Sequence, residues 1–191
     1  MKIGLLAMQG AYEEHMSILK SLNVDTVEIR NKEDLENIDG LIIPGGESTT
    51  MGKLIRNLDI YNDLKSKIES GLPVWGTCAG MILLAKSIYK DDTKHLATMD
   101  IEVRRNAYGR QLGSFNRKSA IKGVGDDIQM VFVRAPYIES IGDKVEVLSV
   151  VDKNIVAAKE DNMLVTSFHP ELTEDNRMHK YFVCMVKNNT K

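Results

Sequence analysis

Three short apolar runs in the first half of the chain limit its possible folds more than any other feature. They span residues 3–8, 40–44 and 72–75, and no charged side chain interrupts them. Strands buried on both faces of a parallel sheet have this character. Helical patterns separate the runs, and alternation of strand and helix is typical of an α/β domain. We therefore expect a central, mostly parallel sheet with helices on both faces, in three layers, as in flavodoxin-like folds.

The segments between these runs carry apolar side chains at the spacing of helices. In the first of them, Tyr12, His15 or Met16, Leu19 and Leu22 fall on one helical face. The same pattern predicts three more helices, at 51–58, 61–68 and 79–85, and a further strand at 26–30.

The pattern changes after about residue 96, where short strand-like runs are bounded by turns. We expect these runs to be antiparallel additions to the sheet, at 101–103, 129–133, 145–150, 155–159 and 163–167. A last helix is expected over 175–187, with Met178, Phe182 and Met185 facing inward, followed by a frayed tail at 188–191. We expect residues 1–191 to form one domain.

Length and composition exclude several classes of protein. A chain of 191 residues with 43% hydrophobic and 27% charged residues has room for one full core. Its net charge of −2 predicts no general attraction to nucleic acid or to an anionic membrane. No apolar stretch approaches the roughly 20 residues that span a bilayer, and no signal peptide is recognised, so we expect a cytoplasmic protein. Two cysteines imply no disulfide framework, and Cys184 is expected to pack on an apolar helix face.

Cys78 occupies a sharp turn between a predicted strand and a predicted helix, in the sequence Gly-Thr-Cys-Ala-Gly. Glycines on both sides permit a tight turn and close approach of other backbone, as in a nucleophile elbow. Exposed N–H groups at the start of the helix favour a thiolate over a thiol. The pattern indicates a cysteine nucleophile; the alternative is a small buried cysteine in a glycine-rich turn.

A histidine and a carboxylate follow the last predicted strand, at His169 and Glu171. A cysteine nucleophile needs a base, and the base needs a group that orients it and stabilises its charged form. Pro170 restricts the backbone between the two side chains. A lone histidine in this place would more often be an ordinary surface or core residue, but together with Cys78 the pair predicts a Cys-His-Glu triad.

Polar loops follow the parallel strands, where ligands bind in open α/β sheets. Gly10 lies in the first loop, and Gly45 to Thr49 form the loop after the third strand. Backbone N–H groups of Gly10, Gly46 and Ala79 are candidates for an oxyanion hole. Alternatively, the second loop is only a helix start with Ser48 or Thr49 as N-cap. It lacks the Gly-Lys-Ser/Thr ending of a phosphate-binding loop.

These motifs resemble those of class I (triad) glutamine amidotransferases. Within that superfamily the chain is similar to the glutaminase subunits of pyridoxal 5′-phosphate synthases. The segments that carry this closer resemblance lie at 5–10, 45–50, 105–111, 132–136 and 168–172. The similarity extends from Ile3 to about Phe182, and no catalytic element of the family is missing.

The resemblance implies that Cys78 attacks the side-chain amide of L-glutamine, that His169 transfers protons and that Glu171 orients His169. It implies contacts with glutamine at six positions, namely Gly46, Glu47, Ser48, Arg105, Val133 and Arg134. A guanidinium suits the substrate's α-carboxylate. The sequence does not decide between Arg105 and Arg134, and the latter could also be a surface charge at a strand end. No metal and no cofactor are implied.

The resemblance also implies a partner, a (β/α)₈-barrel synthase subunit that uses the ammonia to make pyridoxal 5′-phosphate from a pentose phosphate and a triose phosphate. Three alternatives remain at this point. They are a glutaminase subunit for another synthase, a different cysteine hydrolase on the same fold, and a non-catalytic binding subunit. The intact Cys78, His169 and Glu171 argue against the last of these.

Overall fold

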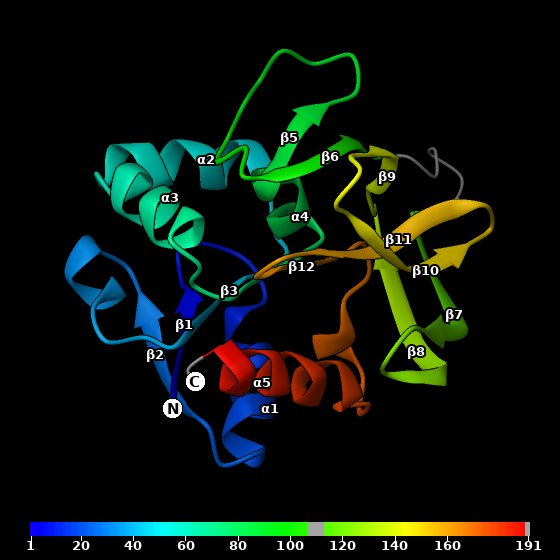
Figure 1. Ribbon diagram of the computed structural model, residues 1–191, viewed down its shortest axis with the longest axis horizontal. Helices are drawn as coiled ribbons and strands as arrows, with labels where there is room; N and C mark the ends of the chain where they lie inside the picture. The colour runs from blue at the N-terminus through cyan, green and yellow to red at the C-terminus, as the bar shows by residue number, and fades with distance from the viewer. Residues whose placement is uncertain (107–112, 190–191) are drawn as a thin grey trace.

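The computed structural model describes residues 1–106 and 113–189. Its first part alternates strands and helices as expected (Figure 1). The elements are β1 (Lys2–Leu6), α1 (Tyr12–Ser21), β2 (Asp25–Ile29), the 3₁₀ turn η1 (Lys32–Leu35), β3 (Gly40–Ile43), α2 (Ser48–Asn57), α3 (Tyr61–Glu69), β4 (Val74–Thr77) and α4 (Ala79–Leu84). The apolar runs form the strands, and β3 and β4 are buried at every position.

Strands dominate the second part of the chain. The elements are β5 (Ala85–Ile88), β6 (Met99–Arg104), β7 (Ser114–Ile121), β8 (Gly125–Val133), β9 (Tyr137–Ile141), β10 (Glu146–Val151), β11 (Asn154–Glu160), β12 (Met163–Thr166), η2 (Pro170–Leu172) and α5 (Arg177–Asn189). Three of these strands, β5, β7 and β9, were not predicted.

Within the described residues, ten strands form one sheet in the order β2-β1-β3-β4-β12-β11-β9-β6-β5, with β10 paired to β11. The strands β2, β1, β3, β4 and β12 are mutually parallel. The pairs β11–β12, β11–β9, β6–β9 and β10–β11 are antiparallel. The expected α/β class, with a mostly parallel centre and antiparallel strands added from the second half, is confirmed.

Two details of that expectation were wrong. Strand β12 is not a peripheral antiparallel addition, because it pairs in parallel with β4 at the centre of the sheet. The run at 129–133 belongs to β8, which pairs with β7 in a separate two-stranded sheet. The pairing of β4 with β12 joins segments far apart in the sequence, whereas β8 forms a hairpin with the unpredicted strand β7.

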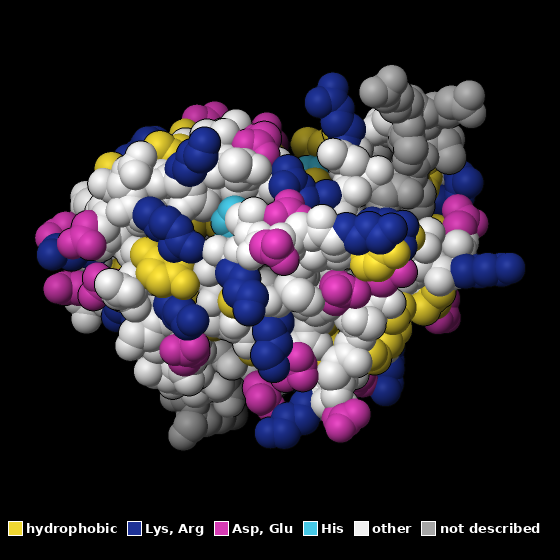
Figure 2. Space-filling view, turned by 90° about the horizontal axis from the view of Figure 1, so that it is seen from above, with side chains coloured by type: hydrophobic (Ala, Val, Ile, Leu, Met, Phe, Trp, Pro, Cys, Tyr) yellow, Lys and Arg dark blue, Asp and Glu magenta, His cyan; other side chains and the backbone are white. Residues whose placement is uncertain are grey.

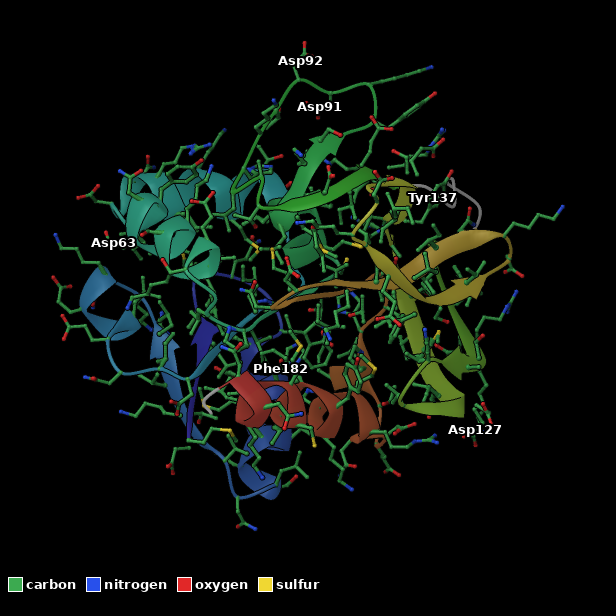
Figure 3. The ribbon with its side chains drawn as sticks, in the orientation of Figure 1. Asp63, Asp91, Asp92, Asp127, Tyr137 and Phe182 are labelled. Atoms are coloured by element: carbon green, nitrogen blue, oxygen red, sulfur yellow. The ribbon has the colours of Figure 1, made fainter. Side chains whose placement is uncertain are left out.

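Helices cover both faces of the central sheet, so the domain has three layers (Figure 1). On one face, α2, α3 and α4 pack their apolar side chains, among them Met51, Ile55 and Leu64, into one buried cluster. On the other face, α1 and α5 contribute Leu19 and Phe182 to a second cluster around Trp75. The Trp75 and Phe182 rings lie 5.7 Å apart, and Phe182 on α5 is labelled in Figure 3.

The last helix differs from its prediction in the exposure of Cys184 and in the residue at which it ends. Cys184 is exposed on α5, so the expectation that it packs on an apolar face was wrong. The helix ends at Asn189 and not at residue 187, and the expected fraying of 188–191 stays a prediction, since residues 190–191 lie outside the described part. Met178 and Phe182 are fully buried, as predicted.

On the face shown in Figure 2, basic and acidic side chains are interspersed. Such a distribution gives no extended field of one sign over this face. Among the helices of residues 1–106 and 113–189, none has the length and apolar character needed to cross a membrane.

Candidate active site

A cavity of about 580 Å³ opens where the parallel strands β1, β3, β4 and β12 end. This is the edge at which open α/β sheets bind ligands. The cavity is lined by Gly10, Ala11, Gly45, Gly46, Glu47, Ser48, Cys78, Ala79, Ile82, Arg105, Asn106, Val133, Arg134, Pro136, His169 and Leu172. All six positions predicted to contact glutamine, and all three candidates for the oxyanion hole, are among them.

Cys78 lies between β4 and α4 in a backbone conformation that side-chain-bearing residues rarely adopt, with φ 48° and ψ −101°. Such strain costs roughly 1–3 kcal/mol and persists where the surrounding structure enforces it. Here the Cys78 N–H donates to the carbonyl of Thr166 at 2.8 Å. A β-carbon on Gly80 would lie 2.1 Å from the Ile43 carbonyl oxygen, so this turn needs a glycine. The predicted strand-to-helix turn is confirmed.

The pairing of β4 with β12 brings Cys78 and His169 together. Thr77 and Thr166 are partners in the parallel register, so the segments that follow them leave the sheet side by side. The His169 N–H donates to the carbonyl of Val131 at 2.8 Å, which anchors the segment after β12 to β8. Pro170 then begins the short turn η2. One pair of neighbouring strands therefore brings together Cys78 and His169, which are far apart in the sequence.

His169 and Glu171 form a buried hydrogen-bonded pair, with 2.6 Å between Nδ1 of the ring and Oε1 of the carboxylate. Burial lowers the pKa of His169, but interactions with Cys78 and Glu171 outweigh burial and raise that pKa to about 10. A histidine with this pKa is an imidazolium at neutral pH. The Cys78 Sγ atom also lies 4.0 Å from the Val133 carbonyl oxygen.

Gly45 contacts the ring of His169, a role that the sequence did not reveal. A β-carbon built on Gly45 would lie 2.3 Å from the ring atom Cε1 and 3.0 Å from Nδ1. Any side chain at this position would displace the imidazole. The glycine pair at residues 45–46 is visible in the sequence. That the His169 ring lies against Gly45 becomes known only from the fold.

Glu47 caps helix α2, with its carboxylate accepting the N–H groups of Thr49 and Thr50 at 3.0 and 2.7 Å. The expectation that Ser48 or Thr49 provides the N-cap was therefore wrong by one or two positions. The Thr50 hydroxyl also donates to Glu47, and these hydrogen bonds lower the pKa of Glu47 to about 2 despite partial burial. Ser48, the first residue of the helix, is buried.

Replacing Glu47 with alanine should destabilise the fold by about 1 kcal/mol, the usual cost of removing an N-cap. The carboxylate's contribution is fully present above pH 4.5, the ordinary pKa of glutamate, and is lost as the pH falls toward 2. Chemical denaturation of Glu47→Ala at pH 7 and at low pH would measure this. Glu47→Gln, which keeps an acceptor oxygen, should lose less. Equal stability of Glu47→Ala and the parent at pH 7 would contradict the capping role.

Arg105 reaches the cavity from the end of β6 and is held between two carboxylates. Its guanidinium lies 3.6 Å from Glu47 and 3.5 Å from Asp91, which Figure 3 labels on the loop after β5. The rest of the predicted segment that begins at Arg105 falls mainly on residues 107–112, outside the described part. Arg134 follows β8 and is exposed, and its N–H donates to the Gly113 carbonyl at 2.7 Å.

Two more histidines lie directly behind the predicted triad. His15 on α1 and His179 on α5 are fully buried, and Nε2 of His15 lies 3.4 Å from Oε2 of Glu171. The sequence placed His15 only on the apolar face of a helix. The sequence could have indicated a role for His15, because a polar ring on an apolar helix face requires a buried hydrogen-bond partner.

The fold and the cavity define a class I glutamine amidotransferase architecture. A solved structure described as a glutamine amidotransferase superposes with a TM-score of 0.92 at 42% identity, covering 97% of this chain and 98% of that one. PurLQS from Thermotoga maritima shares the fold alone, with a TM-score of 0.72 at 14% identity, over 100% of this chain and 99% of that one.

Sequence comparison gives the particular family. The model of the SNO glutamine amidotransferase family matches residues 5–188, so the chain belongs to this family. A Clostridium botulinum protein named pyridoxal 5′-phosphate synthase subunit PdxT is 56% identical over 184 residues, 95% of each chain. A Streptococcus pneumoniae protein of the same name is 56% identical over 191 residues, 98% of each chain.

Proposed function

We propose that this chain is the glutaminase subunit of a pyridoxal 5′-phosphate synthase, and that Cys78, His169 and Glu171 are its catalytic triad. The observation that carries the proposal is that a strained cysteine and a histidine line the same cavity, with a buried glutamate hydrogen-bonded to the histidine ring. The cavity volume of about 580 Å³ suits a small molecule such as L-glutamine. Family membership supports the same substrate.

In the proposed reaction, the Cys78 sulfur attacks the side-chain carbonyl carbon of glutamine, and a tetrahedral oxyanion forms. The imidazolium of His169 donates its proton to the departing nitrogen, the C–N bond breaks, and ammonia leaves behind a γ-glutamyl thioester. Neutral His169 then takes a proton from water, whose oxygen attacks the thioester, and the C–S bond breaks to release L-glutamate. Glu171, 2.6 Å from Nδ1, orients His169 and stabilises its charged form.

We assign glutamine binding to the side of the cavity formed by the loops after β3, β6 and β8. The residues are Gly46, Glu47, Ser48, Arg105, Val133 and Arg134. Because the Glu47 carboxylate is used as a helix cap, its contribution to substrate binding comes from the backbone. A guanidinium, from Arg105 or Arg134, pairs with the α-carboxylate of glutamine.

Backbone N–H groups of Gly46, Ala79 and Gly10 are the proposed donors to the oxyanion. Gly10 has φ +91°, and a β-carbon on it would lie 1.6 Å from the Gly45 carbonyl oxygen. The N–H of Ala11 donates to the same carbonyl at 3.3 Å. The first loop is thus tied to the second, and a change in one peptide orientation would alter the oxyanion hole.

The proposed partner is a (β/α)₈-barrel synthase subunit that combines the ammonia with a pentose phosphate and a triose phosphate. Support for a partner comes from the names of the Clostridium and Streptococcus relatives, each a synthase subunit. Two apolar side chains at the cavity, Val133 and Leu172, are 38% and 47% exposed, so a docking protein would bury them. Docking there would act on the Gly10 loop, which lines the same cavity.

Glutaminase activity should be low in the isolated chain and rise by about 10²–10³-fold on addition of the synthase subunit, the worth of one oxyanion donor. Steady-state kinetics with and without that subunit would measure the change. With glutamine as the source of ammonia, pyridoxal 5′-phosphate should form only when both proteins are present. A full kcat in the isolated chain that the partner leaves unchanged would overturn the gating, and no glutamine hydrolysis under either condition would overturn the function.

A further inference from the structure

A chain of buried polar groups continues behind the predicted triad into the layer of α1 and α5. His15 Nδ1 lies 2.9 Å from His179 Nε2, and His15 Nε2 lies 3.4 Å from both Glu171 Oε2 and Thr77 Oγ1. The side chains of His15 and Glu171 are fully buried. Three of the four histidines in the sequence therefore share one polar network with Glu171.

Packing holds both rings of this network in fixed orientations. The indole of Trp75 on β4 contacts His15 edge-on, with ring centroids 5.4 Å apart. It contacts His179 in the same manner at 5.0 Å. The two histidines therefore rest against a rigid, buried aromatic side chain of the central sheet.

The carboxylate of Glu171 has one satisfied oxygen and one that needs a donor. Oε1 accepts from His169 Nδ1 at 2.6 Å, whereas Oε2 is buried and makes no hydrogen bond of good geometry among the described residues. His15 Nε2, at 3.4 Å, is placed to be its donor. Hydrogen bonds in catalytic sites are often long before substrate binds and tighten in the reacting complex.

The proton positions on the two histidines follow from their surroundings. Burial, with the nearby His179 and His169, lowers the pKa of His15 well below its ordinary value, so His15 is neutral and has one N–H. Burial also lowers the pKa of His179 to about 4. His179 Nδ1 is buried and has no partner among residues 1–106 and 113–189, and a bare acceptor is tolerated there better than an unpaired N–H. His179 therefore donates from Nε2 to His15 Nδ1, which leaves the single proton of His15 on Nε2.

We propose that His15 is a positioning residue for the reaction: its Nε2–H supports Oε2 of Glu171, which keeps Oε1 on His169, and His179 fixes the tautomer of His15. The proposal rests on the function proposed above. A hydrogen bond to the charged carboxylate favours its ionised form and opposes its rotation away from His169. The network thus extends the triad from the cavity to the opposite helical layer.

The tautomers can be tested in the unaltered full-length chain by ¹⁵N NMR of its histidines. At pH 7, His15 and His179 should both be neutral and should both carry the proton on Nε2. A proton on Nδ1 of His15, or a charged His15, would overturn the proposal. This measurement needs no glutamine hydrolysis, so its result is separate from the success or failure of the proposed function.

Substitution tests the effect on the reaction, measured with the synthase subunit present. His15→Phe should lower kcat by about 10–100-fold with little change in KM, the range seen when a group that orients a metal-bound histidine is lost. The basic limb of the kcat–pH profile should move to lower pH, because a less firmly held Glu171 raises the pKa of His169 less. His15→Gln, whose amide nitrogen can replace Nε2, should restore most of both changes.

His95→Phe is the matched control, because His95 is also buried but lies against Gly52 on α2, in the other layer. It should leave the basic limb in place. Equal losses of kcat in His15→Phe and His15→Gln with an unmoved basic limb would reduce His15 to a packing residue and overturn the proposal. If His15→Phe does not fold, as judged by thermal melting, His15→Gln and the tautomer measurement still decide. A loss of kcat of about 10–100-fold in His15→Gln would then contradict the donor role.

Discussion

Cys78→Ser is expected to abolish glutamine hydrolysis, lowering kcat by about 10⁴-fold or more while the fold and partner binding persist. Serine nearly matches cysteine in size, so the strained turn at φ 48° is retained. Its hydroxyl, however, is a far weaker nucleophile than the sulfur of cysteine. Steady-state kinetics, circular dichroism and co-purification with the synthase subunit would measure the three effects.

A glutamine-shaped electrophile provides the matching chemical test. Mass spectrometry should find one adduct, on Cys78, and L-glutamine should protect against it. Cys184 serves as an internal control, because it is exposed and a generic thiol reagent should reach it. An adduct of the glutamine analogue on Cys184 in place of Cys78 would refute the assignment of the nucleophile.

His169→Asn is expected to be nearly as damaging as loss of Cys78, since His169 is the proposed donor of the proton that the leaving nitrogen takes up. Residues that act as one unit give non-additive losses. The Cys78→Ser/His169→Asn double variant should therefore be little worse than either single variant. Fully additive losses in kcat would show that the two residues do not share a mechanism.

Glu171→Gln belongs to the same series, and its loss of kcat should be about 10–100-fold smaller than that of His169→Asn. In the proposed mechanism Glu171 orients and stabilises His169 without transferring a proton. It should also lower the pKa of His169 from about 10, since the carboxylate is one of the groups that raise it. An NMR titration of His169 would follow this shift. An unchanged pKa in Glu171→Gln would contradict the role given to the carboxylate.

The parallel half of the fold could be predicted because its signals are local. Strands β1, β3 and β4 are short runs with every central position buried, and helices between them show a 3.6-residue period. Their order in the sheet, β2-β1-β3-β4, is set by pairings that these local signals do not specify. The runs also did not reveal that β12 is the second neighbour of β4.

Strands β7 and β9 escaped prediction for a physical reason. Most positions of β7 are exposed or half-buried, and its sequence, Ser-Phe-Asn-Arg-Lys-Ser-Ala-Ile, has no clear alternation. It is stabilised by pairing with β8. Strand β9 has five residues, of which one is buried, and lies between β11 and β6. Strand β9 therefore depends on partners distant in sequence, whereas β7 forms a hairpin with β8 but has too weak an apolar pattern to be recognised.

At the site, the triad candidates could be predicted because nucleophile, base and carboxylate carry their chemistry in their residue types. The contact of Gly45 with the His169 ring and the capping role of Glu47 could not, since each depends on which atoms the fold brings near. His15 is the clearest case. Its helical spacing was indistinguishable from that of an apolar residue, and only the approach of α1 to Glu171 reveals a polar partner.

The parallel pair β4–β12 also has a consequence for biosynthesis. The proposed nucleophile and the proposed acid–base pair lie in two segments that are translated one after the other. They meet only after the ribosome has delivered residues 163–171 and β12 has entered the sheet between β4 and β11. Pairings between distant segments form late, because closing the long loop costs chain entropy. A nascent chain that already holds Cys78 therefore lacks the rest of the proposed triad, and glutamine hydrolysis has to wait for β12 to join the sheet.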